Sequence, residues 1–594
     1  MHSISNSSSS SYKSIKTPKC KGCIPLSSKA TSCVACQRIT ITSQKAPPVK
    51  ENKEMTEENL RDILKSWIPN LKPTGLELIV SQFTNGKGRQ NKWSDYKTTI
   101  QTCLRLWVRS KQAYTDFRNS TGLSLPSEST LRRHKNAVPQ DIGLSEDQMA
   151  WMRQQADELH LDTYGRSGGL LLDEMAIQPD IQLVRKGEYL ELVGFTDMGS
   201  VGNAMQMVRD GGTGKKTADH VLQLTFQGFT SMVFPVAHFP TSQVSAQQLY
   251  YIFWKAVHML KAFGFTVHYC SIDGAQANRT FMDKCTKYGN PSSMKGVCRG
   301  LPPVTFIMDI SHVIKKIRNS VLKSRPGGVR HLTLISGKHV EWQHFMDAFA
   351  WDQGNPVSLH RKLSKDHIHE VLKNPSLKMR NHLAEEVLNE DMLRMMTCYA
   401  ATLGEKESEF TGTLEFLGIT SILCRVFRDS KAMSHFSDVR LFDIEKSMQW
   451  FKAWGDWAHS RQDLSNKARG AMLLTAQAMA DLQSCLMGFL VLVKTVQTLH
   501  PGASVIPSTI NSDAIENGFS QQRGLHHGAN SNPSYAAYAK TQNSIALLQP
   551  TISRKSNACP QWHTATPFTY SAAYQQKRKN VVARRLFENK DTDN

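Results

Sequence analysis

Three acidic residues lie where a buried segment of chain would rarely carry a charge. Asp173 lies within an apolar run (169–177), Asp273 ends a second run (267–273), and Glu516 lies far downstream. Buried strands seldom carry carboxylates. Carboxylate oxygens are the ligands that Mg²⁺ and Mn²⁺ prefer, and a pair of such ions promotes phosphoryl transfer on nucleic acids. The three residues are therefore candidate metal ligands and candidate catalytic residues.

Each of the three residues also has a plain structural interpretation. Asp173 could be a carboxylate on an edge strand, Asp273 a turn residue before Gly274, and Glu516 an exposed helix residue. Their joint occurrence is what favours a metal site. Glu174 follows Asp173 directly and must point to the opposite face of a strand, so we do not expect it to share the role.

The charge balance predicts a polyanionic partner. Lys and Arg number 72 and Asp and Glu 51, which gives a net charge of +21 over 594 residues. Nucleic acid fits such an excess best, and an anionic membrane comes second. The longest apolar stretch, residues 485–493, is shorter than the roughly 20 residues that span a membrane, so we expect no membrane association.

Cysteine use and the start of the chain indicate a compartment. The Ser-rich start lacks the apolar segment of a secretory signal, and eight of the twelve cysteines are scattered as reduced core thiols would be. Two basic clusters near the end, 577–579 and 584–585, resemble an import signal, although a solvated basic tail has the same composition. We expect a nuclear protein.

The other four cysteines form two Cys-x2-Cys pairs in residues 1–57, which otherwise have the composition of an unstructured segment and linker. Cys20, Cys23, Cys33 and Cys36 could supply the four thiolates of a small Zn²⁺ site. The nine-residue gap between the pairs is short for such a site. The alternative is free thiols in an unstructured tail.

Residues 58–150 carry helical periodicity and end in a basic helix. Three successive helices, the last one containing Leu131, resemble a helix-turn-helix. Arg132, Arg133 and Lys135 are then candidate DNA contacts. A plain helical bundle with a solvated basic face would have the same pattern.

Residues 165–320 change to short apolar runs bounded by turn residues, which predicts strands. We expect strands at 170–177, 189–196, 221–227, 266–272 and 304–308, with a long helix beginning at Ser245. Three strands as a meander, followed by helix, strand, helix and strand, is the element order of an α/β fold of the RNase H-like type, with a mixed sheet and helices on both faces. In that fold Asp173 lies on the first strand and Asp273 ends the fourth.

Residues 321–505 are helical and too long for a loop, so we expect a helical insertion domain before the core resumes at 506–555; a basic unstructured tail, 556–594, follows. Just before the insertion, Lys315, Lys316 and Arg318 are candidate phosphate contacts. His312 follows Asp309 by three positions, and the pair could orient the site or cap a helix.

Five blocks of sequence, in order, resemble the P-element-type transposases and their THAP-domain-containing relatives, over residues 74–550. The blocks are 93–134, Asp173-Glu174-Met175, Asp273-Gly274-Ala275 with Asn278-Arg279, Asp309 to His312 with 315–319, and 513–519 with Arg523-Gly524, Asn530 and Asn532-Pro533. Each block alone is a weak signal, and five in the right order are a strong one. The full THAP zinc finger that usually opens such proteins is missing from this resemblance.

The resemblance implies a DNA transposase of the Asp-Asp-Glu type, with Asp173, Asp273 and Glu516 as the triad that holds Mg²⁺ or Mn²⁺. It further implies GTP bound in the insertion as an assembly cofactor. Asp513 would then recognise guanine, and Lys378 and Arg380 would contact the nucleotide. Transposon ends and target DNA would be the partners of at least a dimer.

Two other functions fit the same sequence features. One is a domesticated DNA-binding or regulatory protein that keeps the fold and the basic charge without the chemistry. The other is an RNase H-like nuclease that cuts DNA without joining it.

Overall fold

The computed structural model describes residues 56–85, 93, 96–186, 188–212, 214–230, 232–287, 297–298, 304–525 and 532–548. The chain divides into two compact units, Met1–Thr99 and Ile100–Asn594. The four N-terminal cysteines (Cys20, Cys23, Cys33 and Cys36), Asn530 and the tail 556–594 lie outside the described residues. The zinc site therefore stays a prediction.

In the first unit, helices α2 (Glu57–Trp67) and α3 (Pro73–Asn85) pack together. Glu57 begins α2 and accepts hydrogen bonds from Thr84 and Tyr96, while Arg61 pairs with Glu77 at 3.1 Å. The helical periodicity of residues 58–150 therefore begins in a helix.

The three predicted helices before the strands are present as α4 (Lys97–Arg109), α5 (Lys111–Ser120) and α6 (Glu128–Lys135). A fourth helix that we did not predict, α7 (Glu146–Glu158), follows them. Ser127 caps α6 by accepting from the backbone of Thr130, and Tyr114 Oη on α5 donates to the carbonyl of Pro126 at 2.7 Å. These bonds set the turn between α5 and α6.

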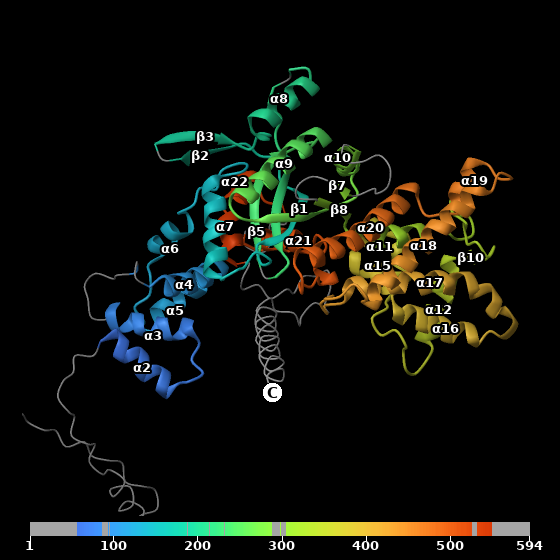
Figure 1. Ribbon diagram of the computed structural model, residues 1–594, viewed down its shortest axis with the longest axis horizontal. Helices are drawn as coiled ribbons and strands as arrows, with labels where there is room; N and C mark the ends of the chain where they lie inside the picture. Colours follow the sequence, from blue (N-terminus) through green and yellow to red (C-terminus); the bar gives the residue numbers. More distant parts are fainter. Residues whose placement is uncertain are drawn as a thin grey trace, which may run out of the picture. The chain divides into compact units, whose positions relative to one another are not determined.

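A six-stranded mixed sheet forms the centre of the second unit, in the order β5-β4-β1-β6-β8-β7 (Figure 1). The strands are β1 (Ser167–Ala176), β4 (His220–Gly228), β5 (Val233–Thr241), β6 (Thr266–Ile272), β7 (Val297–Cys298) and β8 (Val304–Met308). β4 runs antiparallel to both of its neighbours, β1 and β5, whereas β6 and β8 run parallel to β1. The predicted α/β fold class is confirmed.

The predicted position of one strand in the sheet is wrong. The segment 189–196 does not join the central sheet, because β3 (Tyr189–Val193) pairs with β2 (Gln182–Lys186) as a separate hairpin, followed by helix α8 (Gly199–Arg209). The third strand of the meander is β5, whose Pro235 and Pro240 hide its strand pattern. Proline is tolerated there because, among the described residues, β5 is an edge strand of the sheet.

Helices cover both faces of the sheet, as the alternation of side chains along β8 demonstrates. Phe306 packs on Phe253 of α9 (Ala246–Ala262) and on Phe281 of α10 (Gln276–Lys287). The neighbours of Phe306 on β8 face α20 (Ala476–Leu499) instead. There Gly488 comes so close to β8 that a Cβ would lie 2.9 Å from the carbonyl oxygen of Phe306.

The segment between α11 (Ile310–Val321) and the return to the core is built of helices, as predicted. Its elements are β9 (Leu332–Thr333), β10 (His339–Val340), α12 (Trp342–Gln353), the π-helix η2 (Asp366–Glu370), α13 (Val371–Lys373), α14 (Pro375–Lys378), α15 (Asn381–Leu388), α16 (Glu390–Ala401), η3 (Gly404–Lys406), α17 (Glu407–Arg428), α18 (Val439–Ser460), α19 (Asn466–Ala471), α20 and η4 (Pro507–Thr509). Residues 404–428 and 476–499 are long and apolar enough to cross a membrane, yet 67% and 56% of their most apolar windows are buried inside the protein. Core helices have the same character.

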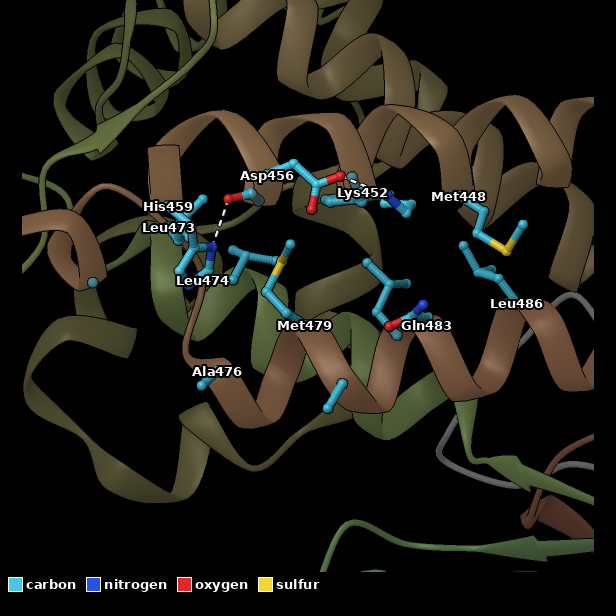
Figure 2. A pocket seen from close by; sticks show the side chains of 15 residues that line it. Met448, Lys452, Asp456, His459, Leu473, Leu474, Ala476, Met479, Gln483 and Leu486 are labelled. Atoms are coloured by element: carbon cyan, nitrogen blue, oxygen red, sulfur yellow. Dashed lines mark hydrogen bonds and ion pairs between the residues drawn. The ribbon is translucent and has the colours of Figure 1, made fainter. Parts of the chain in front are cut away.

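A cavity of about 320 Å³ lies between α18 and α20 (Figure 2). Its wall is mainly apolar and includes Met448, Met479 and Leu486, with Lys452 paired to Asp456 at the rim. Of the described residues that we predicted to bind nucleotide, none lines this cavity.

After the insertion the chain returns to the sheet through α21 (Asp513–Leu525), α22 (Tyr535–Ala539) and α23 (Gln542–Leu548). Tyr538 Oη and Gln542 Nε2 both donate to Gln223 Oε1 on β4, at 2.7 and 2.9 Å. This buried hydrogen-bond set fastens the last helices to the strand beside β1.

The close packing of β1 against β6 can be tested at Gly169. A Cβ there would lie 2.2 Å from the buried Tyr269 ring, so Gly169→Ala should destabilise the protein by about 1–3 kcal/mol. Gly418 on α17 is the matched control: its Cβ would meet nothing within 4 Å, and Gly418→Ala should stabilise by about 0.5–1 kcal/mol. Thermal unfolding measures both, and equal shifts for the two variants would contradict this packing.

Candidate active site

Three neighbouring parallel strands carry an aspartate at the same level: Asp173 lies within β1, and Asp273 and Asp309 directly follow β6 and β8. Leu171 of β1 lies beside Ser271 of β6, and Ile272 of β6 lies beside Met308 of β8. Continuing these registers past the paired residues sets Asp173, Asp273 and Asp309 in one row across the end of the sheet. The carboxyl ends of parallel strands are where open α/β sheets carry their sites.

Glu516, in the first turns of α21, faces this row. Ser512 Oγ donates to Asp309 Oδ2 at 2.9 Å and lies 3.2 Å from Glu516 Oε1, so one hydroxyl bridges the two carboxylates. His312 lies 3.8 Å from Glu516 and 3.9 Å from Asp309. One ligand atom from each of Asp309, His312 and Glu516 lies within 4.8 Å of the others, which is compatible with a shared metal ion.

Local hydrogen bonds hold Asp273 in place. Its Oδ1 accepts from the backbone N–H of Ala275 at 2.9 Å and from Asn278 Nδ2 at 2.5 Å. Both donors bind the same oxygen, so Oδ2 is the oxygen that these two bonds leave for another ligand. Glu174 on the next position of β1 accepts instead from Thr241 at 2.9 Å, away from the row.

Burial and like charges shape the acid–base behaviour of the site. Burial raises the pKa of Asp173 well above its ordinary value, and the nearby carboxylates of Glu516, Asp273 and Asp309 raise it further. Burial likewise raises the pKa of Glu516, with Asp309 adding to it and His312 opposing it. Carboxylates crowded in this way bind a divalent cation with release of protons.

The structure brings together the three acidic residues predicted from the sequence and adds a fourth, Asp309. In the sequence Asp309 ends an apolar strand just as Asp273 does, so the same signal could have found it. We instead assigned Asp309 and His312 an orienting or capping role. Capping does occur, since Asp309 accepts from the backbone of Ser311 at 3.2 Å, but its second oxygen faces the acidic site.

The fold of the chain resembles that of known proteins. Residues 141–286, which include Asp173 and Asp273, match the family model of the TNP-like, RNase H N-terminal domain. A solved structure, the Drosophila P element transposase strand transfer complex, superposes with a TM-score of 0.60 over 84% of this chain and 100% of that chain, at 16% identity. The chain has the fold of a P-element-type transposase. No curated protein sequence matches it.

This P-element-type fold brings Asp513 close to the acidic row. Burial raises the pKa of Asp513 well above its ordinary value, and Asp309, Glu516 and Glu385 of α15 raise it further. Lys378, which ends α14, presents its backbone carbonyl to Arg318 Nη2 at 3.0 Å, and Arg380 is exposed. The guanine and nucleotide contacts that we expected of Asp513, Lys378 and Arg380 stay predictions.

The three cations that we expected on DNA lie in different environments on α11. Arg318 is fully buried and bonds the carbonyl of Lys378, so it is not available to a phosphate in this structure. Lys315 is nearly buried, and burial lowers its pKa, opposed by the neighbouring Asp309 and Glu516. Lys316 Nζ donates to Asp481 of α20 at 2.6 Å. These three basic residues of α11 therefore make their contacts mainly within the protein.

On α6 the predicted DNA contacts separate into two kinds. Arg132 and Arg133 are exposed. Lys135 is half-buried and donates to the carbonyl of Lys540 at 2.9 Å, and burial lowers its pKa to about 8. Arg132 and Arg133 remain candidates for DNA, while Lys135 is engaged within the protein.

The acidic row should make the metal-free protein less stable as pH rises. Below about pH 4 the carboxyl groups are protonated in both the folded and the unfolded chain, so they do not affect stability. Above that pH Asp173 ionises freely in the unfolded chain, whereas its raised pKa makes ionisation costly in the folded chain, and stability falls. Asp173→Asn should therefore raise the melting temperature in EDTA at pH 8, by roughly 1 °C for each kcal/mol relieved in a chain of this length, and have little effect at pH 4.

Exposed Asp116 on α5 provides the control for this pH experiment. Asp116→Asn should leave the melting curve unchanged at both pH values. A melting temperature lowered by Asp173→Asn at pH 8 in EDTA would contradict the repulsion inferred for the acidic row.

Proposed function

We propose that this chain is a DNA transposase of the Asp-Asp-Glu type, which cuts and joins DNA by metal-dependent phosphoryl transfer. The observation that carries the proposal is the row that Asp173, within β1, and Asp273, directly after β6, form across two adjacent parallel strands, with Glu516 facing it. The match to a TNP-like RNase H domain and the likeness to a P element transposase complex support it.

The donor set fits Mg²⁺ or Mn²⁺, because it consists of hard carboxylate oxygens whose mutual repulsion a divalent cation would relieve. Asp173, Asp273 and Glu516 would hold the ions, with Asp309 and His312 beside Glu516. Bound divalent ions would supply charge that activates an attacking oxygen and stabilises the leaving one.

The protein's own groups have two roles in this proposal. Asn278 and the backbone of Ala275 orient Asp273 before any substrate arrives. His312 lies 3.9 Å from Asp309 and 3.8 Å from Glu516, so its ring would offer a nitrogen ligand beside the two carboxylates. Pre-oriented ligands lower the cost of assembling the site.

Several finer features belong to the same proposal. GTP would bind near Asp513 as an assembly cofactor, with Lys378 and Arg380 as nucleotide contacts. Transposon ends and target DNA would be the partners, a dimer or larger assembly the working form, and the nucleus its location. The retained acidic set favours an active enzyme over a domesticated DNA-binding protein.

The decisive experiment is a strand-transfer assay with purified protein, pre-cut DNA ends, GTP and Mg²⁺ or Mn²⁺. Asp273→Ala and Glu516→Ala should each lower product formation by at least about 10³-fold, because each removes an oxygen ligand. Glu174→Gln, which changes the adjacent carboxyl that bonds Thr241, is the matched control and should stay within a few-fold of the wild type.

The outcomes separate the proposed function from its rivals. Joined product that disappears in Asp273→Ala supports the transposase. Nicked DNA without joined product would favour a nuclease, and DNA binding without either product would favour the domesticated protein.

DNA binding by α6 gives an independent prediction. Arg132→Ala and Arg133→Ala should each reduce the slope of log K against log salt by about 1, because each exposed cation would neutralise one phosphate. Lys135→Met should leave the slope unchanged, since Lys135 bonds the carbonyl of Lys540. Fluorescence anisotropy at several salt concentrations measures the slopes, and an unchanged slope in both arginine variants would exclude this helix from the DNA interface.

A further inference from the structure

A buried carboxylate of the helical insertion contacts two cations of the catalytic core. Asp481 on α20 accepts from Arg279 Nε at 2.9 Å and Nη2 at 2.8 Å, and from Lys316 Nζ at 2.6 Å. Its side chain is only 2% exposed. Both oxygens of Asp481 are engaged, and the bidentate geometry with Arg279 makes this a specific contact.

The two cations belong to the helices that follow the acidic strand ends. Arg279 follows Asn278, the residue that bonds Asp273, in the first turns of α10. Lys316 lies one turn beyond His312 on α11, the helix that begins after Asp309. Asp481 therefore joins the helices behind two of the acidic residues to one helix of the insertion.

Gly274 demonstrates how closely this joint packs on the Asp273 loop. A Cβ at Gly274 would lie 1.9 Å from Lys316 Nζ, 2.7 Å from Asp481 Oδ2 and 2.8 Å from Arg279 Nη2. All three charged groups thus pack directly against the backbone that follows Asp273.

We propose that Asp481 is a positioning residue, through which the helical insertion holds the Asp273 loop and α11 in the arrangement that binds metal. The inference rests on the proposed function, because it concerns the same acidic site. Both oxygens of Asp481 accept hydrogen bonds from Arg279 and Lys316, so Asp481 is not itself a metal ligand. Its effect on the metal site passes through those two side chains.

Charge balance gives the physical reason. Without the carboxylate of Asp481, Arg279 and Lys316 would be left as two uncompensated cations beside Asp273. They would pair with the acidic row and compete there with a divalent ion, while the loop lost its anchor. Both effects weaken metal binding, and changes to groups that orient metal ligands typically cost about 10–100-fold in affinity.

The test is a Mn²⁺ titration of the full chain, followed by the electron paramagnetic resonance signal of free Mn²⁺, beside the strand-transfer assay. Asp273→Ala identifies the site. Asp481→Asn should weaken Mn²⁺ binding about 10-fold and slow joining at saturating DNA about 10²-fold, with the Kd for DNA changed less than about 3-fold. Asp481→Glu, which keeps the charge, should recover most of the Mn²⁺ affinity.

Asp438 provides a matched control within the insertion. It pairs with Arg440 at 2.6 Å, is 16% exposed, and caps α18. Asp438→Asn removes a similar ion pair and should lower the melting temperature without changing Mn²⁺ affinity. If Asp481→Asn does not fold, Arg279→Lys, which keeps the charge and loses the bidentate bond, should show the same Mn²⁺ effect at smaller size.

The outcomes distinguish this inference from the proposed function. Unchanged Mn²⁺ affinity in folded Asp481→Asn and Arg279→Lys, or an equal loss in Asp438→Asn, would overturn the positioning role. If Asp481→Asn weakens Mn²⁺ binding but the wild type joins no DNA, the positioning role is supported and the proposed transposase function is overturned. If the wild type shows no Mn²⁺ binding that is lost in Asp273→Ala, both the positioning role and the proposed transposase function are overturned.

Discussion

Convergence of like charges at one end of the sheet is the constraint on which the rest of the structure depends. The parallel registers of β1, β6 and β8 bring three aspartates into a row, and α21 adds Glu516. Such crowding opposes folding when no cation is bound, as the raised pKa values of Asp173 and Glu516 indicate. α11 begins directly after Asp309 and α21 begins three residues before Glu516, so the positive ends of two helix dipoles offset part of this repulsion.

The insertion is part of the core as well as an appendage to it. Helix α20 packs on β8 at Gly488, where only a glycine allows the approach, and its Asp481 bonds Arg279 and Lys316. One face of the sheet is therefore covered by a helix, α20, that comes much later in the sequence than the strand it covers, β8. The acidic site and the insertion consequently pack against each other, so a displacement of α20 would also displace the surroundings of Asp273.

Much of this arrangement follows from the sequence, and the exceptions have physical reasons. Acids within or directly after apolar strands, and the order of strands and helices, predict the sheet and the site at Asp173 and Asp273. Strand β5 was missed because its prolines break the expected pattern, although the edge position tolerates them. The inward direction of Lys315 and Arg318 depends on what packs on α11, and a cluster of positive charges in a sequence does not contain that information.

The long separation between the last strand of the sheet and the helices that complete its cover has a consequence for synthesis. Residues 309 and 516 leave a ribosome roughly 10–40 s apart at about 5–20 residues per second, which follows from the 207 positions between them (516 − 309). During that interval β4 lacks Tyr538 and Gln542, the partners of its buried Gln223. The nascent chain thus carries an incompletely covered sheet, and heterologous production should benefit from chaperones that bind exposed apolar surface.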